Sequence, residues 1–400
     1  MITLSGRLSG LEESVTLAIT AKARALKAGG RDIISFGAGE PDFDTPENIK
    51  EAAIKAIRGG QTKYTPVGGI NELKDAIISK FKRDNSLSYT RDEVIVSCGG
   101  KHSIYNLFQS ILDHGDEVII PAPYWVSYPV MVSLAGGVPV ELRTTGAEGF
   151  KMSAAAFRSR ITPKTKAVVI NSPSNPTGAA YTGAELEAIA AVALEKNLLI
   201  ISDEIYEKIA YDGFKVTSIA SVSDEVKRNT VVLNGVSKTY SMTGWRIGYA
   251  AGPAHIIKAM TSIQSQSTSN PCSISQWAAL EAISGPQDAL AGMVAEFSRR
   301  RDAMVEGLSA IGGVSCFKPQ GAFYVFADIS ETLGKRYGER TIKGSADVAN
   351  YLLDEAGVAV VPGEPFGDDS HIRLSYAMSM EHIVEGVKRI KESFARLERG

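Results

Sequence analysis

Apolar residues recur along this chain with two different spacings, and segments of the two kinds alternate. Spacing typical of an amphipathic helix marks residues 17–28, 49–57, 73–81, 104–112 and 186–194. Short apolar runs bounded by turn or polar residues occupy positions 93–97, 117–121, 167–171, 198–202, 230–233 and 247–251. Strands that alternate with helices predict an α/β fold, with a mostly parallel central sheet that is flanked by helices.

The pattern changes after about residue 300. Helices are predicted at 296–308 and 380–397, and strands near 323–327, 358–361 and 371–375. These elements form no regular alternation, so we expect a second, smaller α+β lobe. The chain has 400 residues, which exceeds the size at which a single hydrophobic core keeps growing, and this also favours two domains.

Composition and charge exclude several classes of protein. Hydrophobic residues make up 44% of the chain and charged residues 22%, as in a compact globular protein. The 43 basic and 45 acidic side chains give a net charge of -2 and form no basic stripe, so neither nucleic acid nor a membrane surface is an expected partner. The apolar stretch 186–201 is interrupted by polar residues, and no signal-peptide core precedes residue 10. The chain is expected to be neither exported nor membrane-spanning.

The three cysteines give no sign of a disulfide framework or a metal site. Cys98, Cys272 and Cys316 lie far apart and match no spacing of metal ligands. A reducing cytoplasm is therefore the expected location.

In a parallel sheet, ligands bind outside the carboxyl ends of the strands, so chemistry is sought directly after each apolar run. Asp203 follows one run, in Ser202-Asp203-Glu204-Ile205-Tyr206, and could bind a protonated ring nitrogen. A helix cap or an ion pair would also explain an acidic residue at that place.

Two further segments follow predicted strands. Asn175 lies in a turn rich in proline and glycine that could present its amide to a ligand oxygen, although a turn alone would explain those residues. Lys238 lies between Ser237 and Thr239, and Arg246 follows eight positions later. A lysine is usually a solvated surface charge, but one that a crevice desolvates becomes a nucleophilic amine able to form a Schiff base.

Together these segments resemble the fold-type I pyridoxal-phosphate enzymes, specifically the class I aminotransferases of the bacterial aspartate and aspartate/prephenate subgroup. The resemblance covers essentially the whole chain, and its motifs occur in family order. They are Gly39-Glu40-Pro41-Asp42-Phe43, Tyr64-Thr65-Pro66, Pro123-Tyr124-Trp125, Asn175-Pro176-Thr177-Gly178, the Asp203 segment, the segment from Ser237 to Arg246, and Arg373-Leu374-Ser375-Tyr376.

The resemblance implies a large domain at 46–295, a small domain at 296–400, and an N-terminal arm at 1–45 that joins the small domain. It implies pyridoxal 5'-phosphate as cofactor and a homodimer as the active form. The substrates would be amino acids and 2-oxo acids: aspartate and 2-oxoglutarate would give oxaloacetate and glutamate, and prephenate is a further candidate acceptor.

The resemblance also assigns roles around the cofactor. Lys238 would hold it covalently and carry a proton, Asp203 would bind the ring nitrogen, and Trp125 would stack on the ring, although an ordinary core aromatic would look the same in sequence. Asn175 and Tyr206 would bind the phenolic oxygen. Ser237 is also expected at the cofactor.

Phosphate binding needs backbone N–H groups at a helix start and a fixed positive charge. Gly99, Gly100 and Lys101 begin a helix directly after a strand, and Arg246 supplies the charge. The resemblance adds Tyr64 from the partner subunit.

For the substrate, the resemblance places Arg373 at the α-carboxylate, where arginine binds in a bidentate fork, with Gly39, Trp125 and Asn175 beside it. A structural ion pair is the alternative for Arg373. The distal carboxylate would meet Lys101, Ser14 and Thr16. Lys101 could instead serve the phosphate or be a solvated lysine, and Ser14 and Thr16 could cap a helix.

Two competing functions remain. Lyases share the lysine, aspartate and arginine of fold-type I, because the fold does not determine the reaction. Ligand-sensing regulators with an aminotransferase-like domain normally carry a DNA-binding domain before it. The motifs here begin at Gly39, so the regulator is the less expected alternative.

Overall fold

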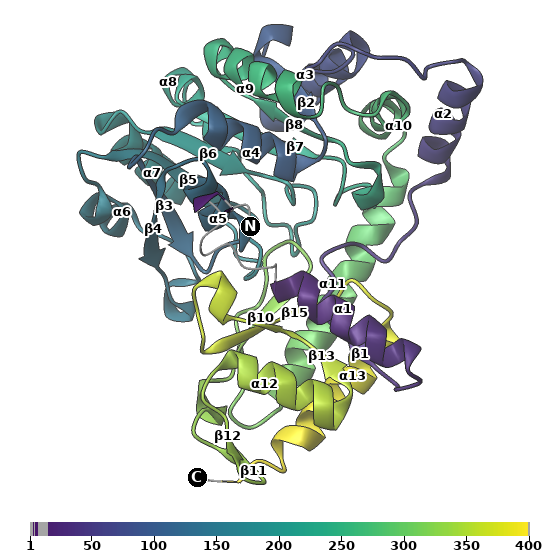
Figure 1. Cartoon of the computed structure of the whole chain (residues 1–400), viewed down its shortest axis with the longest axis vertical. Coiled ribbons are helices and arrows are strands. Elements are labelled where there is room, and N and C mark those ends of the chain that lie inside the picture. The colour runs from purple at the N-terminus through teal and green to yellow at the C-terminus, as the bar shows by residue number, and fades with distance from the viewer. Residues whose placement is uncertain (1–2, 4, 7–14, 399–400) are drawn as a thin grey trace.

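The computed structural model of the chain describes residues 3, 5–6 and 15–398. Its largest sheet has the strand order β2-β8-β7-β6-β5-β3-β4, in which β8 is antiparallel to both neighbours and the others are parallel (Figure 1). The strands are β2 (Val94–Ser97), β3 (Glu117–Ala122), β4 (Val138–Arg143), β5 (Thr165–Asn171), β6 (Leu199–Asp203), β7 (Thr230–Gly235) and β8 (Gly248–Ala251). The predicted α/β fold is confirmed.

Helices cover both faces of this sheet because apolar side chains alternate between the two faces of each strand. Val94 and Val96 face one cluster, while Ile95 between them faces the other. The same alternation separates Ile119 from Val118 and Ile120. The helices of this part are α2 (Glu47–Arg58), α3 (Asn71–Asn85), α4 (Gly100–Ile111), α5 (Ser127–Leu134), α6 (Ala154–Arg160), α7 (Gly183–Glu195), α8 (Asp224–Arg228), α9 (Ala254–Ser267) and α10 (Ser273–Ser284).

The smaller lobe combines both ends of the chain, as the purple and yellow segments of Figure 1 show. Strand β1 (Ile34–Ser35) pairs in parallel with β13 (Val358–Ala359), about 320 residues later. An antiparallel sheet has the order β14-β15-β10-β9. Its strands are β9 (Ser315–Cys316), β10 (Tyr324–Asp328), β14 (Val361–Pro362) and β15 (His371–Ser375), beside a small hairpin of β11 (Arg336–Tyr337) and β12 (Arg340–Thr341). The helices are α1 (Val15–Ala28), α11 (Asp288–Ser309), α12 (Ser345–Tyr351) and α13 (Met380–Phe394).

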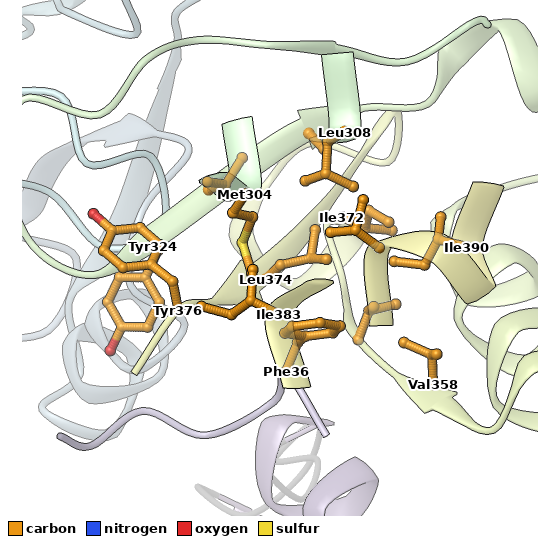
Figure 2. Close-up of a cluster of buried hydrophobic side chains, with 14 of the residues drawn as sticks. Phe36, Met304, Leu308, Tyr324, Val358, Ile372, Leu374, Tyr376, Ile383 and Ile390 are labelled. Carbon is orange, nitrogen blue, oxygen red and sulfur yellow. The ribbon is translucent and has the colours of Figure 1, made fainter. Parts of the chain in front are cut away.

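One apolar cluster fills the smaller lobe. Figure 2 shows Met304 of α11 against Leu374 of β15, with Phe36 from the N-terminal segment beside Ile383. Three residues that follow β6 of the large sheet, Tyr206, Ile209 and Tyr211, belong to the same cluster. The large sheet therefore sends a loop into the core of the smaller lobe.

One strand prediction was wrong, and one strand of the large sheet was missed. The range 358–361 was predicted as one strand, but β13 pairs with β1 and β14 pairs with β15, so the chain passes from one sheet to another at Val360. All residues there are buried, so their pattern carries no sign of the break. Strand β4 was missed because it is an edge strand that contains a proline and has only one fully buried side chain, that of Leu142.

The predicted domain limits stay predictions. Helix α11 runs without a break from Asp288 to Ser309, across the predicted limit at 295 and 296. In the described part of the chain, no helix combines the length and the apolar character that crossing a membrane requires.

Gly248 in β8 packs directly against the backbone at the start of α4. A Cβ at this position would lie 2.2 Å from the Gly100 nitrogen and 2.4 Å from the Gly99 carbonyl carbon. We predict that Gly248→Ala lowers the free energy of unfolding by about 1–3 kcal/mol, because the backbone must move apart.

Urea unfolding followed by circular dichroism measures this loss. Gly244→Ala is the matched control, since a Cβ there meets no atom within 4 Å, and its change should stay within about 0.5 kcal/mol. Equal stability of the two variants would contradict the close packing at Gly248.

Candidate active site

A cavity of about 400 Å³ lies at the carboxyl edge of the large sheet, where the smaller lobe meets it. Segments that are far apart in sequence contribute to its wall, as expected for the carboxyl ends of parallel strands. Eleven of the residues predicted for the site line it: Gly39, Gly100, Lys101, Trp125, Asn175, Asp203, Tyr206, Ser237, Lys238, Arg246 and Arg373.

Lys238 extends into this cavity from the turn after β7. Its Nζ donates a hydrogen bond to the backbone carbonyl of Gly39, in the segment that follows β1. Burial lowers the pKa of Lys238 to about 8, against a partial rise from Glu40; Arg373 and Arg246 lower it further. A substantial fraction of this amine is therefore neutral near pH 8, as a nucleophile requires.

Asp203 ends β6 and faces the same cavity. Its Oδ2 accepts a hydrogen bond of 2.6 Å from the Tyr128 hydroxyl, and its Oδ1 accepts one of 3.2 Å from the Ile205 N–H. Burial raises the pKa of Asp203, while these hydrogen bonds and the charge of Lys238 act in the opposite direction. The contact with Ile205 is a local turn. Each carboxylate oxygen of Asp203 accepts one hydrogen bond here and can accept another, from a cationic group in the cavity.

Arg373, in the centre of β15, is 2% exposed. It donates through Nη1 to Asn175 Oδ1 at 3.0 Å and through Nη2 to the Gly37 carbonyl at 3.1 Å. Its Nε is buried without a hydrogen-bond partner among the described residues. Both acceptors are neutral, so these contacts differ from the ion pair that was the alternative for Arg373, and the guanidinium charge is left for an anion.

The start of α4 and Arg246 form one corner of the cavity. The N–H groups of Gly100 and Lys101 lie in the first turn of the helix, where no intrahelical acceptor exists. Arg246 is held by a hydrogen bond of 2.7 Å from its Nη1 to the Thr243 carbonyl. A Cβ on Gly99 would lie 2.3 Å from Arg246 Nη2, so a glycine is needed beneath this arginine. Unpaired N–H groups and a guanidinium suit a phosphate.

Trp125 and Lys101 lie side by side at the cavity wall. Lys101 Nζ is 4.9 Å from the centroid of the Trp125 ring, which packs edge-on against Tyr128. Burial, and then the charge of Arg246, lower the pKa of Lys101. A second cation next to Arg246 extends the part of the cavity that attracts anions.

Two predicted residues do not line the cavity, and two others have side chains outside the part of the chain that the structure describes. Gly99 lies beneath Arg246 and does not line the cavity, and Tyr64 is outside it with 90% of its surface exposed. Ser14 is outside the described residues. Thr16 lies in α1, but its side chain is outside the described part.

Sequence reasoning missed several lining residues, including Tyr128, Asn171, Thr243 and Tyr324. Asn171 is the last residue of β5, so the rule of strand ends could have found it; it donates to the Asp203 carbonyl and accepts from the Asn175 N–H. Tyr128 lies three residues after Trp125, in the first turn of α5, and this spacing gave a weaker signal. No sequence signal marked Tyr324, because β10 belongs to the other sheet.

The chain is similar to aminotransferases over almost its full length. A family model described as aminotransferase class I and II matches residues 31–390. An aspartate aminotransferase of a Bacillus species is 56% identical over 388 residues, which cover 97% of this chain and 98% of the relative. A probable aspartate/prephenate aminotransferase of Rickettsia conorii is 53% identical over 395 residues, 98% of each chain.

Solved structures agree. The aspartate aminotransferase of Rhizobium meliloti has a TM-score of 0.96 at 46% identity and covers 100% of both chains. That of Thermus thermophilus with maleate has a TM-score of 0.92 at 47% identity and covers 98% of this chain and 100% of the other. The predicted family is thus confirmed: the chain belongs to the class I and II aminotransferases.

Proposed function

We propose that this chain is a pyridoxal-phosphate-dependent aspartate aminotransferase, which transfers the amino group of aspartate reversibly to 2-oxoglutarate and forms oxaloacetate and glutamate. The observation that carries the proposal is the Lys238 amine, whose pKa is lowered to about 8 inside a cavity that also holds Asp203 and Arg373. A nucleophilic amine, a buried carboxyl group and a guanidinium that bonds to two neutral acceptors are the three ionisable groups that this reaction needs in one place.

The residues of the cavity fit pyridoxal phosphate. The first turn of α4 and Arg246 would hold the phosphate, Trp125 would contact the ring, and Asp203 would pair with the ring nitrogen. Because Asn175 Oδ1 already accepts from Arg373, its Nδ2 is directed to donate, as binding of a phenolic oxygen requires. When bound, this cofactor supplies an aromatic ring that accepts electrons from the substrate's α-carbon.

Asp203 and Tyr128 act together in this proposal. Burial raises the pKa of Asp203, and the hydrogen bond that Tyr128 donates to Oδ2 acts against this and favours the ionised carboxylate. The Tyr128 hydroxyl is itself buried and its pKa lies well above the ordinary value, so it stays a donor. An ionised Asp203 can then stabilise a positive charge on a ring nitrogen.

Lys238 is proposed to act as nucleophile and as general base. Its amine, when neutral, can take the proton from the α-carbon of the substrate, and a pKa near the working pH suits both gain and release of a proton. Arg373 would bind the α-carboxylate through its planar fork and orient that carbon toward Lys238.

Acidic substrates are supported by the relatives and by Lys101. Relatives at 52–56% identity carry the name aspartate aminotransferase, and maleate, found with the Thermus thermophilus structure, is a four-carbon dicarboxylate. Lys101 adds a second cation at the cavity wall. Since Arg373 is proposed to bind the α-carboxylate, Lys101 is available for a second carboxylate. Ser14 and Thr16 stay predictions for the same distal carboxylate.

Prephenate is a second candidate acceptor, since relatives named aspartate/prephenate aminotransferase match at 52–53% identity over nearly the whole chain. A homodimer is also proposed, because Tyr64 is exposed outside its own cavity and would serve the phosphate site of the partner subunit. The cytoplasmic location remains a prediction.

We predict that the purified protein, loaded with pyridoxal phosphate, converts aspartate and 2-oxoglutarate to oxaloacetate and glutamate. Lys238→Ala should lower kcat by a factor of at least ~10². The variant should still bind the cofactor noncovalently, since other residues contact it. A coupled assay for oxaloacetate measures turnover, and the absorbance of cofactor retained after gel filtration measures noncovalent binding. Borohydride reduction followed by peptide mapping should label Lys238 in the wild type and leave the variant unlabelled.

Lys258→Ala, a change of an exposed lysine on α9, is the control and should keep its activity. Pyruvate and ammonia in place of oxaloacetate would indicate a lyase. Parallel assays with prephenate as acceptor test the second candidate.

We predict that inactive Lys238→Ala and inactive Tyr64→Ala subunits recover activity when mixed. In an equal mixture half of the dimers are hybrids, each with one intact site, so about one quarter of the wild-type activity is expected. Absence of recovery after subunit exchange, verified by mass spectrometry, would contradict a shared site.

We predict that Lys101→Ser lowers kcat/KM for aspartate by about 10- to 100-fold and largely spares alanine and phenylalanine, because only a dicarboxylate loses a charged hydrogen bond. An equal loss for all substrates, with weaker cofactor binding, would assign Lys101 to the phosphate. No loss for any substrate would leave it as a solvated lysine.

A further inference from the structure

Tyr324 connects the apolar core of the smaller lobe with the cavity. Its ring is 1% exposed and belongs to the core cluster, and the residue also lines the cavity. In Figure 2 it lies at one end of the cluster, with its hydroxyl directed away from Met304 and Leu374. Tyr324 therefore places a polar atom from β10 opposite the residues that the large sheet contributes.

The hydroxyl groups of Tyr324 and Tyr206 form a hydrogen bond of 2.9 Å, in which either oxygen can donate. Burial raises the pKa of both phenols, so both keep their protons. Two hydroxyls have two protons and only one bond between them. One of the two hydroxyl protons is therefore available to an acceptor outside the pair. The tyrosine that donates its proton to such an acceptor can only accept in the bond between the two hydroxyls.

The proposed cofactor would fix the direction of the hydrogen bond between Tyr206 and Tyr324. The proposed function gives Tyr206 an acceptor, the phenolic oxygen of the cofactor, to which its single proton must be donated. Tyr206 can then only accept from Tyr324. A hydroxyl that accepts one hydrogen bond becomes a stronger donor in the next, because the two bonds polarise each other.

Tyr324 also contacts the end of the cavity where the substrate carboxylate would bind. The Arg373 guanidinium lies 4.5 Å from the centroid of the Tyr324 ring. A Cβ on Gly39 would lie 3.5 Å from the Tyr324 hydroxyl, so this hydroxyl adjoins the backbone that accepts from Lys238. One side chain thus touches a cofactor-binding residue and a carboxylate-binding residue.

We propose that Tyr324 is a positioning residue, which donates to Tyr206, strengthens the hydrogen bond from Tyr206 to the cofactor, and couples this bond to the occupancy of Arg373. The proposal rests on the proposed function for the identity of the cofactor. It does not depend on which amino acid is the substrate.

Charged groups from four other segments face the tyrosine pair. Arg373 on β15 favours the ionised phenols, whereas Asp203 at the end of β6 and Glu40 after β1 disfavour them. Lys238, after β7, has its Nζ 5.9 Å from the ring centroid of Phe323, the neighbour of Tyr324 in sequence. Replacement of a phenol by a phenyl group changes none of these charges, so its effect can be assigned to the hydroxyl.

The test is a pH titration of the visible absorbance of the cofactor in the holoenzyme. A hydrogen bond donated to the phenolic oxygen stabilises its anion, and a weaker bond leaves that oxygen more basic, so the bound cofactor loses its proton at higher pH. We expect Tyr324→Phe to raise the midpoint by about half a pH unit.

A double-mutant cycle shows whether Tyr324 acts through Tyr206. Tyr206→Phe alone should raise the midpoint further, and Tyr324→Phe should have no additional effect in that background. Saturating maleate should also shift the midpoint less in Tyr324→Phe than in the wild type, because binding at Arg373 and the tyrosine pair are linked.

Tyr376→Phe is the matched control. The Tyr376 hydroxyl is buried in the same cluster and bonds to Tyr211 and the Ala322 carbonyl, but it does not line the cavity, so its loss should leave the midpoint unchanged. An unshifted midpoint in Tyr324→Phe, or an equal shift with and without the Tyr206 hydroxyl, would overturn the proposal. Because the readout is the bound cofactor, a failure of aspartate turnover would be recognised separately.

Discussion

Three ionisable side chains, Lys238, Asp203 and Arg373, lie half-buried or buried around one cavity, and the rest of the structure depends on this arrangement. Burial of an isolated charge is costly unless hydrogen bonds or opposite charges compensate it. Here each group is compensated only in part. Lys238 donates to a carbonyl, Asp203 accepts from Tyr128, and Arg373 Nε has no hydrogen-bond partner within the described part of the chain. The remaining interactions are left for ligands with complementary charge.

Such a cavity requires two lobes that keep their relative position. Asp203 and Lys238 come from the large sheet, whereas Arg373 and Tyr324 come from the antiparallel sheet of the smaller lobe. The loop after β6 joins the two, because Tyr206 and Tyr211 lie in the core of the smaller lobe. In the same loop Asp212 pairs with the fully buried Arg301 of α11, which also lies 4.6 Å from the Tyr211 ring. A displacement of one lobe would disturb the site and the core together.

Close backbone contacts hold the phosphate corner in place. Gly248 allows β8 to pack against the first residues of α4, and Gly99 leaves space for Arg246. Helix α4 therefore begins at a fixed position relative to the strands that carry Asp203 and Lys238. The geometry around the proposed phosphate site is thus a result of how the sheet packs, and not of side chains alone.

The sequence by itself determined the fold class and most of the lining of the cavity. Hydrophobic periodicity located six of the seven strands of the large sheet, because strands buried on both faces show as continuous apolar runs. The rule of strand ends and the family motifs located Asp203, Lys238 and Asn175, since those residues follow strands directly in the chain. Tertiary structure decided the rest. Only the pairing of β14 with β15 divided the buried range 358–361 into two strands, and only the packing of β10 against the loop after β6 brought Tyr324 to Tyr206. These contacts join residues more than a hundred positions apart or buried on all sides, and in neither case does local periodicity carry the information.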